Sequence, residues 1–127
     1  MDYKQLIEAF GDAFNHHDAT SLVSMMTEDC VFYTLGGDQA SGTPIHGKQA
    51  VKAAFEAVWQ AMPDAQWKPL NSFVDGANGL SLWHFTGTNS DGSIVDAHGC
   101  DIFTFKDGKI QVKNAFRKNC PLQNANA

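Results

Sequence analysis

The sequence lacks the features that mark membrane-spanning, secreted and nucleic-acid-binding proteins. It has no run of about eighteen apolar residues, so no segment is expected to cross a membrane. No basic stretch followed by an apolar one occurs near Met1, so we expect no secretory signal. Nine basic residues against 14 acidic ones give a formal net charge of −5, which argues against nucleic acid or a membrane surface as the main partner.

Cysteine is scarce as well. Cys30, Cys100 and Cys120 are odd in number and show no CxxC spacing, which predicts reduced thiols and a cytoplasmic location rather than a disulfide scaffold. The five histidines show no spacing typical of a ligand set, and no P-loop pattern is present. We therefore expect neither a metal site nor a bound cofactor.

The composition is that of one folded domain. Of the 127 residues 43% are apolar and 18% charged, which is enough to bury a core and too apolar for disorder. No repeat or linker divides the chain, so a single domain is predicted over residues 1–118. The polar segment 119–127 is predicted to be a flexible tail.

Helical patterns occupy the N-terminal half. Apolar residues recur every three or four positions between Tyr3 and Phe14, which predicts an amphipathic helix. Asp18 suits the N-cap of a short second helix. A third helical pattern begins near Gly47 and stops before Pro63.

Strand patterns fill most of the remainder. The run 30–35 is rich in β-branched and aromatic residues, and four further runs are 66–74, 80–88, 94–105 and 109–117. Short connections with glycine beside Asp or Asn join the last four, which predicts antiparallel hairpins. The fold class is therefore α+β. Long strands curl, and the three helices laid across the concave side would leave a cone-shaped cavity for a small apolar molecule.

The order of these elements resembles the NTF2-like superfamily with its cystatin-like fold, in particular SnoaL-like polyketide cyclases and ketosteroid isomerases. The resemblance implies a cone-like, curved antiparallel sheet covered by three N-terminal helices. It also implies a homodimer formed through the outer sheet face, to which Tyr33, Ile94 and Val112 could contribute. The segments that carry the resemblance are 15–18 (NHHD), 27–32 (TEDCVF), 45–51 (IHGKQAV), 99–105 (GCDIFTF) and 107–110 (DGKI), together with Arg117.

Asp101 is the strongest catalytic candidate. It lies in an otherwise apolar strand, where burial disfavours the charged form of a carboxyl, which suits a general acid or a neutral hydrogen-bond donor. By resemblance, it falls where ketosteroid isomerases keep an oxyanion-stabilising aspartate and close to the acid/base aspartate of SnoaL-like cyclases. The alternative is a structural ion pair with Lys113 or Arg117 on the neighbouring strand.

The remaining isomerase machinery is not matched. By resemblance, Thr34 takes the position of the general base and Phe10 that of the oxyanion tyrosine. Threonine cannot shuttle a proton between carbon atoms near neutral pH. We therefore do not expect a standard ketosteroid isomerase mechanism.

Three further polar residues are candidates for catalysis. Lys113 and Arg117 are four residues apart, hence on one strand face, and point into the cavity if Ile110 and Val112 face outward. There they could bind an enolate, a phenolate or a carboxylate; otherwise they form a solvated basic strand end. His98 would pair with Asp101 only if Gly99 forms a bulge, because strict alternation places the two on opposite faces.

The ligand-binding candidates are Thr34 and aromatic residues at core-facing positions, for which ordinary core packing is the alternative. They are Phe14, Phe32, Phe55, Trp59, Trp83 and Phe103. Two hypotheses follow. One is a cofactor-independent enzyme that transfers protons on a cyclic, carbonyl-containing substrate, as in an isomerase, a cyclase or a dehydratase. The other is a non-catalytic ligand-binding or dimerisation module of the same fold.

Overall fold

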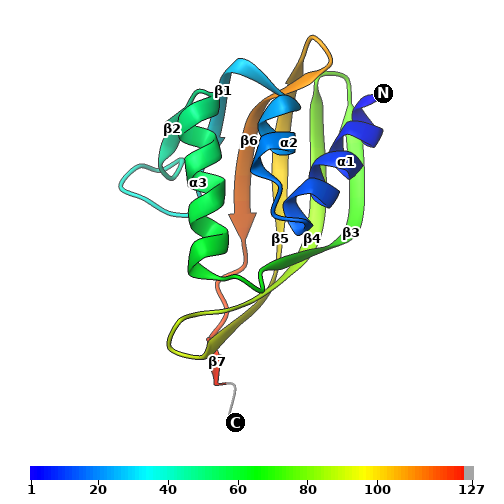
Figure 1. The fold of residues 1–127 in the computed structure, drawn as a ribbon. Helices are drawn as coiled ribbons and strands as arrows, with labels where there is room; N and C mark the ends of the chain where they lie inside the picture. Colours follow the sequence, from blue (N-terminus) through cyan, green and yellow to red (C-terminus); the bar gives the residue numbers. More distant parts are fainter. Residues whose placement is uncertain (125–127) are drawn as a thin grey trace.

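A computed structural model shows one sheet with three helices packed on it (Figure 1), and it describes residues 1–124. The elements, in chain order, are α1 (Tyr3–Asn15), α2 (Ala19–Ser24), β1 (Met26–Tyr33), β2 (Pro44–His46), α3 (Lys48–Ala61), β3 (Gln66–Asp75), β4 (Asn78–Thr88), β5 (Ser93–Lys106), β6 (Lys109–Arg117) and β7 (Gln123–Asn124).

The helices begin where the sequence places capping residues. Asp2 caps α1: its side chain accepts from the Gln5 amide at 2.8 Å, and the Gln5 side chain accepts from the Asp2 amide at 2.9 Å. Asp18 caps α2 in the predicted way by accepting from the Ser21 amide at 3.1 Å. Gly47 precedes α3 with a φ of +85°, a value that favours glycine.

The sheet confirms the predicted meander and extends it. β3, β4, β5 and β6 pair antiparallel in succession, and the strand order is β2-β1-β6-β5-β4-β3. β1 joins the far side of β6 in parallel, and β2 pairs antiparallel with β1. The predicted α+β class, with a curved sheet under three helices, is confirmed.

All three helices cover the same face of the sheet (Figure 1). α1 lies across β3 and β4, and α3 lies over β1 and β2. This arrangement buries the apolar stripe of each helix against the inward-facing side chains of the strands. The largest fully buried side chains of the core are Phe55, Phe85, Phe103, Leu22, Met26, Ile110, Val51 and Cys30.

The C-terminal segment, predicted to be a flexible tail over 119–127, contains one short strand. Gln123 and Asn124 form β7, which pairs with Ser93 and Ile94 at the start of β5. The rest of that prediction, residues 125–127, lies outside the described residues. In the described part of the chain, no helix has the length and apolar character needed to cross a membrane.

Candidate functional site

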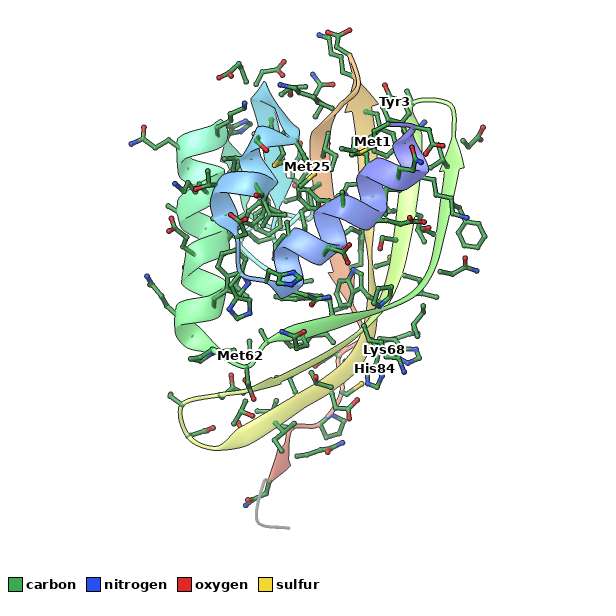
Figure 2. The ribbon with its side chains drawn as sticks, turned by 45° about the vertical axis from the view of Figure 1, so that its right-hand side comes forward. Met1, Tyr3, Met25, Met62, Lys68 and His84 are labelled. Atoms are coloured by element: carbon green, nitrogen blue, oxygen red, sulfur yellow. The ribbon has the colours of Figure 1, made fainter. Side chains whose placement is uncertain are left out.

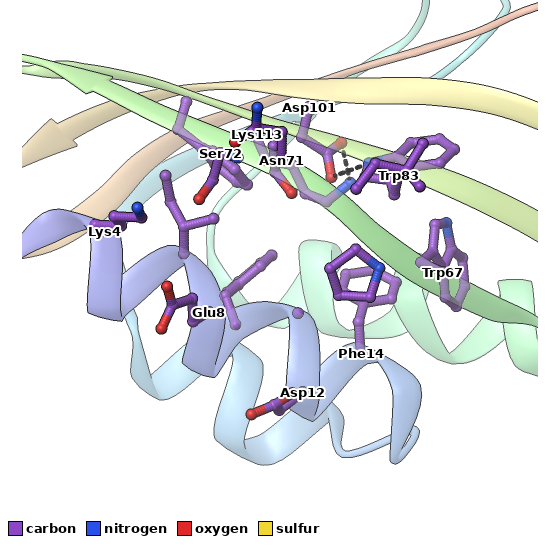
Figure 3. A pocket seen from close by; sticks show the side chains of 17 residues that line it. Lys4, Glu8, Asp12, Phe14, Trp67, Asn71, Ser72, Trp83, Asp101 and Lys113 are labelled. Atoms are coloured by element: carbon purple, nitrogen blue, oxygen red, sulfur yellow. Dashed lines mark hydrogen bonds and ion pairs between the residues drawn. The ribbon is translucent and has the colours of Figure 1, made fainter.

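A cavity of about 490 Å³ lies between α1 and the inner face of the sheet (Figure 3). One wall is α1 and the other is formed by β3 and β4. Asp101 and Phe103 of β5 and Lys113 of β6 complete its lining. Its aromatic lining residues are Phe10, Phe14, Trp67, Trp83 and Phe103.

Asp101 reaches this cavity because β5 alternates regularly. Ala97, Gly99, Asp101, Phe103 and Phe105 are all buried, and the residues between them face the other side. Asp101 is only 7% exposed, yet both carboxylate oxygens accept hydrogen bonds. Oδ1 accepts from Lys113 Nζ at 2.7 Å, and Oδ2 accepts from Trp83 Nε1 at 3.1 Å (Figure 3).

Lys113 is 5% exposed and forms an ion pair with Asp101, which was the alternative to a catalytic role for that carboxyl. The ammonium group lies 5.0, 4.8 and 5.9 Å from the ring centres of Phe14, Phe32 and Phe55. Aromatic faces attract a cation, so these rings partly offset the loss of hydration around Nζ. The ion pair and the cavity lining involve the same two residues.

The register of β6 differs from the expected alternation. Ile110 was expected to face outward with Val112, but it is fully buried in the core. The pairing of β5 with β6 shifts by one residue between Thr104 and Phe105, which turns Ile110 inward while Lys113 keeps the inner face. Val112 is half-buried.

Gly99 places the indole that holds Asp101. It is the cross-strand partner of Trp83, and a Cβ added to it would lie 2.4 Å from Trp83 Cη2. Without a side chain at residue 99, the six-membered ring of the indole comes close to Gly99 while its Nε1 reaches Asp101. Gly99 therefore permits a close approach rather than forming the bulge considered above.

The mouth of the cavity is polar. Lys4, Glu8 and Asp12 lie on one side of α1, and Asn71 and Ser72 of β3 face them (Figure 3). These residues and Trp67 of β3 were not predicted from the sequence. The four-residue spacing of Lys4, Glu8 and Asp12 could have indicated a shared helix face beside the apolar stripe.

His98 does not lie in the cavity. It is exposed on the outer face of β5, so it does not pair with Asp101. Its ring centre lies 5.0 Å from that of His84, whose Nε2 is 2.5 Å from Asp96 Oδ1. His84 is also the cross-strand partner of Lys68 (Figure 2). Regular alternation was the correct prediction here.

Arg117 and Thr34 lie outside the cavity lining. Arg117 is half-buried with its guanidinium 5.1 Å from the ring centre of Phe85, and desolvation lowers the pKa of this group. Thr34 donates from Oγ1 to the Gly36 carbonyl at 2.7 Å and accepts from the Thr43 amide at 3.0 Å. It therefore holds the loop that follows β1.

The predicted aromatic ligand contacts divide into two groups. Phe14, Trp83 and Phe103 line the cavity. Phe32 and Phe55 lie behind Lys113, where their rings face its ammonium group. Trp59 lies farther away and stacks on His17 with ring centres 4.9 Å apart.

The cavity offers the groups for proton transfer and for charge stabilisation. Asp101 supplies a carboxylate whose two oxygens each keep a free lone pair, and Lys113 supplies an ammonium donor. Together they could remove a proton beside a carbonyl group and stabilise the resulting enolate. Within residues 1–124, no cluster of three or more His, Cys, Asp or Glu side chains is arranged to hold a metal ion.

The sequence matches the family model described as a SnoaL-like domain over residues 7–112. No curated protein matches it significantly.

Several solved structures share the fold at low sequence identity. Bal32a, from a soil-derived mobile gene cassette, is 18% identical with a TM-score of 0.81, over 91% of this chain and 88% of that one. A candidate polyketide cyclase from Xanthomonas campestris pv. campestris is 16% identical with a TM-score of 0.80, covering 91% and 89%. TerC, co-crystallised with polyporic acid, is 17% identical with a TM-score of 0.78, covering 90% and 89%.

Proposed function

The chain belongs to the family of SnoaL-like domains, and we propose that it binds a small, largely apolar cyclic carbonyl compound and catalyses proton transfer on it. The reaction would be of the isomerase, cyclase or lyase type and would need no cofactor. The description of one similar structure as a candidate polyketide cyclase, and of another as a complex with polyporic acid, supports this ligand class.

The observation that carries the proposal is the Asp101–Lys113 ion pair inside an aromatic cavity. A buried ion pair has a high desolvation cost, and apolar residues of similar volume often replace it without loss of stability. Retaining both charged groups in the cavity lining is therefore better explained by a ligand than by stability. The aromatic walls would bind the rings and exclude water.

In the proposed mechanism Lys113 and Asp101 have separate roles. Lys113 donates a hydrogen bond to the carbonyl oxygen and stabilises the negative charge that develops there. Asp101 removes the proton from the adjacent carbon and returns it elsewhere on the substrate. Trp83 holds Oδ2 of Asp101 and so fixes the direction of the carboxylate. The Asp101 carboxylate accepts two hydrogen bonds, which favours the role of base over that of oxyanion donor. Lys113 then takes the role of oxyanion donor.

The test combines ligand binding with hydrogen exchange. Steroids, aromatic polyketides, terpenes and small acids are first screened by thermal shift. A ligand at a hundred times its dissociation constant should add about 2.7 kcal/mol of stability. Ketones that bind are then incubated with the protein in D₂O, and NMR follows the loss of their α-hydrogens.

The wild-type protein should accelerate the exchange, and Asp101→Asn should slow it by about 100-fold to 10,000-fold while remaining folded. Asp96→Asn, on the same strand but on the outer face, is the matched control and should exchange at the wild-type rate. Binding without exchange in the wild-type protein would overturn the enzyme proposal.

A non-catalytic binder is the second candidate, and one observation favours it. Among the described residues, Asp101 is the sole carboxylate deep in the cavity lining. Thr34, which by resemblance takes the position of the isomerase base, lies outside that lining. For a binder, Asp101→Asn would leave ligand affinity within the range expected for one lost hydrogen bond. Free thiols at Cys30, Cys100 and Cys120 support a cytoplasmic location for either function.

We also propose a homodimer formed through the outer sheet face. Phe73, Ile102 and Phe116 are 58%, 41% and 48% exposed. The register places Phe116 beside Cys100 on β5, and Leu80 between Phe73 and Ile102. An exposed apolar surface of this kind favours association. Native mass spectrometry should detect a dimer, and Phe116→Lys should shift it to monomer; a wild-type monomer at micromolar concentration would contradict the proposal.

A further inference from the structure

We propose that Lys113 forms an imine with an aromatic aldehyde or ketone that enters the cavity. The inference rests on the proposed function because it uses the same cavity and the same ion pair. It adds a covalent step and a carbonyl class that proton transfer alone does not require.

The Lys113 amine differs in its surroundings from the other lysine of the cavity. Two lysines line the cavity among the described residues, and Lys4 is exposed at its mouth while Lys113 is buried at its inner end. The Lys4 amine is open to solvent, whereas the Lys113 amine lies among aromatic rings, where a carbonyl compound that enters the cavity meets it away from bulk water. Such desolvated lysines are the ones that form Schiff bases with carbonyl compounds.

The Lys113 amine has a proton acceptor beside it. Asp101 Oδ1 lies 2.7 Å from Lys113 Nζ, so one proton can pass between them without any movement of the backbone. The transfer converts an ion pair into a neutral amine and a neutral acid. Trp83 stays hydrogen-bonded to the other oxygen and keeps the carboxyl group facing Nζ.

The step balances with these groups alone. The Lys113 amine attacks the carbonyl carbon, and the C–N bond forms while the proton on Asp101 moves to the carbonyl oxygen. Asp101 then takes a proton from nitrogen and returns it to the departing hydroxyl, so the C–O bond breaks and water leaves. The products are a protonated imine, one water molecule and the Asp101 carboxylate, with the total charge unchanged.

The surroundings of Lys113 also suit the product of the reaction. Phe14, Phe32 and Phe55 face Nζ, and a protonated imine carries the same positive charge as the ammonium they already face. Phe10, Trp67 and Phe103 line the space beyond Nζ, which suits a flat aromatic group on the carbonyl carbon. The cavity volume of about 490 Å³ accommodates a bicyclic ring.

The test is reductive trapping with 2-naphthaldehyde. The full chain is incubated with a limiting amount of this aldehyde and sodium cyanoborohydride, and peptide mass mapping locates the reduced adduct. Lys113 should carry most of the adduct at early times, ahead of exposed lysines such as Lys4 and Lys109. Excess naphthalene, which fits the cavity but cannot form an imine, should protect Lys113 and leave the exposed lysines unaffected.

Lys113→Arg keeps the positive charge opposite Asp101 but cannot form an imine, so the fast adduct should disappear. Lys109→Arg on the same strand is the control and should label at Lys113 like the wild-type protein. Adducts on exposed lysines with none at Lys113 would overturn the proposal. This outcome can be read from the wild-type protein alone, so it does not depend on how the variants fold. If α-hydrogen exchange occurs but no adduct is trapped, the imine proposal is overturned and the proposed proton transfer stands. If an adduct is trapped but no exchange occurs, the proposed proton transfer is overturned and covalent binding of the carbonyl compound stands.

Discussion

The indole ring of Trp83 occupies the space in which a side chain of residue 99 would lie. A Cβ on Gly99 would come within 2.4 Å of Trp83 Cη2 and of the Phe116 carbonyl oxygen. The same indole donates from Nε1 to Asp101, two residues farther along β5. The absence of a side chain at Gly99 thus lets Trp83 Nε1 donate a hydrogen bond to Asp101 in the candidate site.

Gly99→Ala should therefore destabilise the protein and disturb the site. Overpacking of this kind costs about 1–3 kcal/mol, and the indole has to move away from Asp101. Chemical denaturation measures the free energy of unfolding, and near-UV circular dichroism reports the movement of the tryptophan. Gly11→Ala in the middle of α1 is the control: its Cβ would meet no atom within 4 Å, so helix propensity predicts a gain of about 0.5–1 kcal/mol. Equal stability of the Gly99→Ala variant and the wild-type protein would contradict the interpretation.

Local patterns in the sequence predicted most of the fold. The periodicity of α1 and α3, the caps and the hairpin turns depend on residues close together in the chain. The regular alternation of β5 also placed Asp101 and His98 on opposite faces. The parallel pairing of β1 with β6 and the short strand β2 depend on contacts between distant segments, and no local pattern indicated them.

The site was predictable only in part for the same reason. Asp101 stood out as a carboxyl within an apolar strand and Lys113 by its four-residue spacing from Arg117, and both line the cavity. Which aromatic residues line it depends on how α1 crosses β3 and β4. Phe32 of β1 and Phe55 of α3 lie behind Lys113, and Trp67 of β3 reaches the wall.

A second prediction concerns acid stability. The Asp64 carboxylate accepts from the Thr88 hydroxyl at 2.6 Å and from the Thr88 amide at 2.8 Å, and these hydrogen bonds lower its pKa below the ordinary value of 3.8. A carboxyl with a depressed pKa in the folded state stabilises the protein above its unfolded-state pKa. The contribution is lost as the pH falls through the folded-state pKa.

Asp64→Ala should accordingly lower the melting temperature at pH 7, and the difference from the wild-type protein should shrink as the pH falls below 3.8. Thr88→Val removes the hydroxyl donor and should reproduce part of the loss. Thermal melts between neutral and strongly acidic pH measure both effects. A difference that stays constant across this range would show that the ionised carboxylate does not contribute.

A third prediction concerns the thiols. Cys30 is buried, Cys100 is half-buried and Cys120 is exposed. Desolvation raises the pKa of both the Cys30 and the Cys100 thiol, which lowers their thiolate fraction near neutral pH. An aromatic disulfide reagent at mildly alkaline pH should therefore modify one thiol rapidly, and Cys120→Ser should remove this fast phase. A fast phase that persists in the variant would assign it to another cysteine.

The last prediction separates stability from function at the Asp101–Lys113 pair. Lys113→Met leaves a buried carboxylate without its cation, and breaking a buried pair in this way costs about 3–5 kcal/mol. Asp101→Asn combined with Lys113→Met removes both charges and still offers Trp83 Nε1 an amide oxygen as acceptor. This double variant should recover most of the lost stability, because no charge remains buried, yet it should show neither α-hydrogen exchange nor imine trapping. Denaturant unfolding of both variants, with Lys109→Met as an exposed control, measures the difference. If the double variant is no more stable than Lys113→Met, the pair contributes to folding in a way that neutral side chains cannot replace, and stability rather than a ligand accounts for its burial.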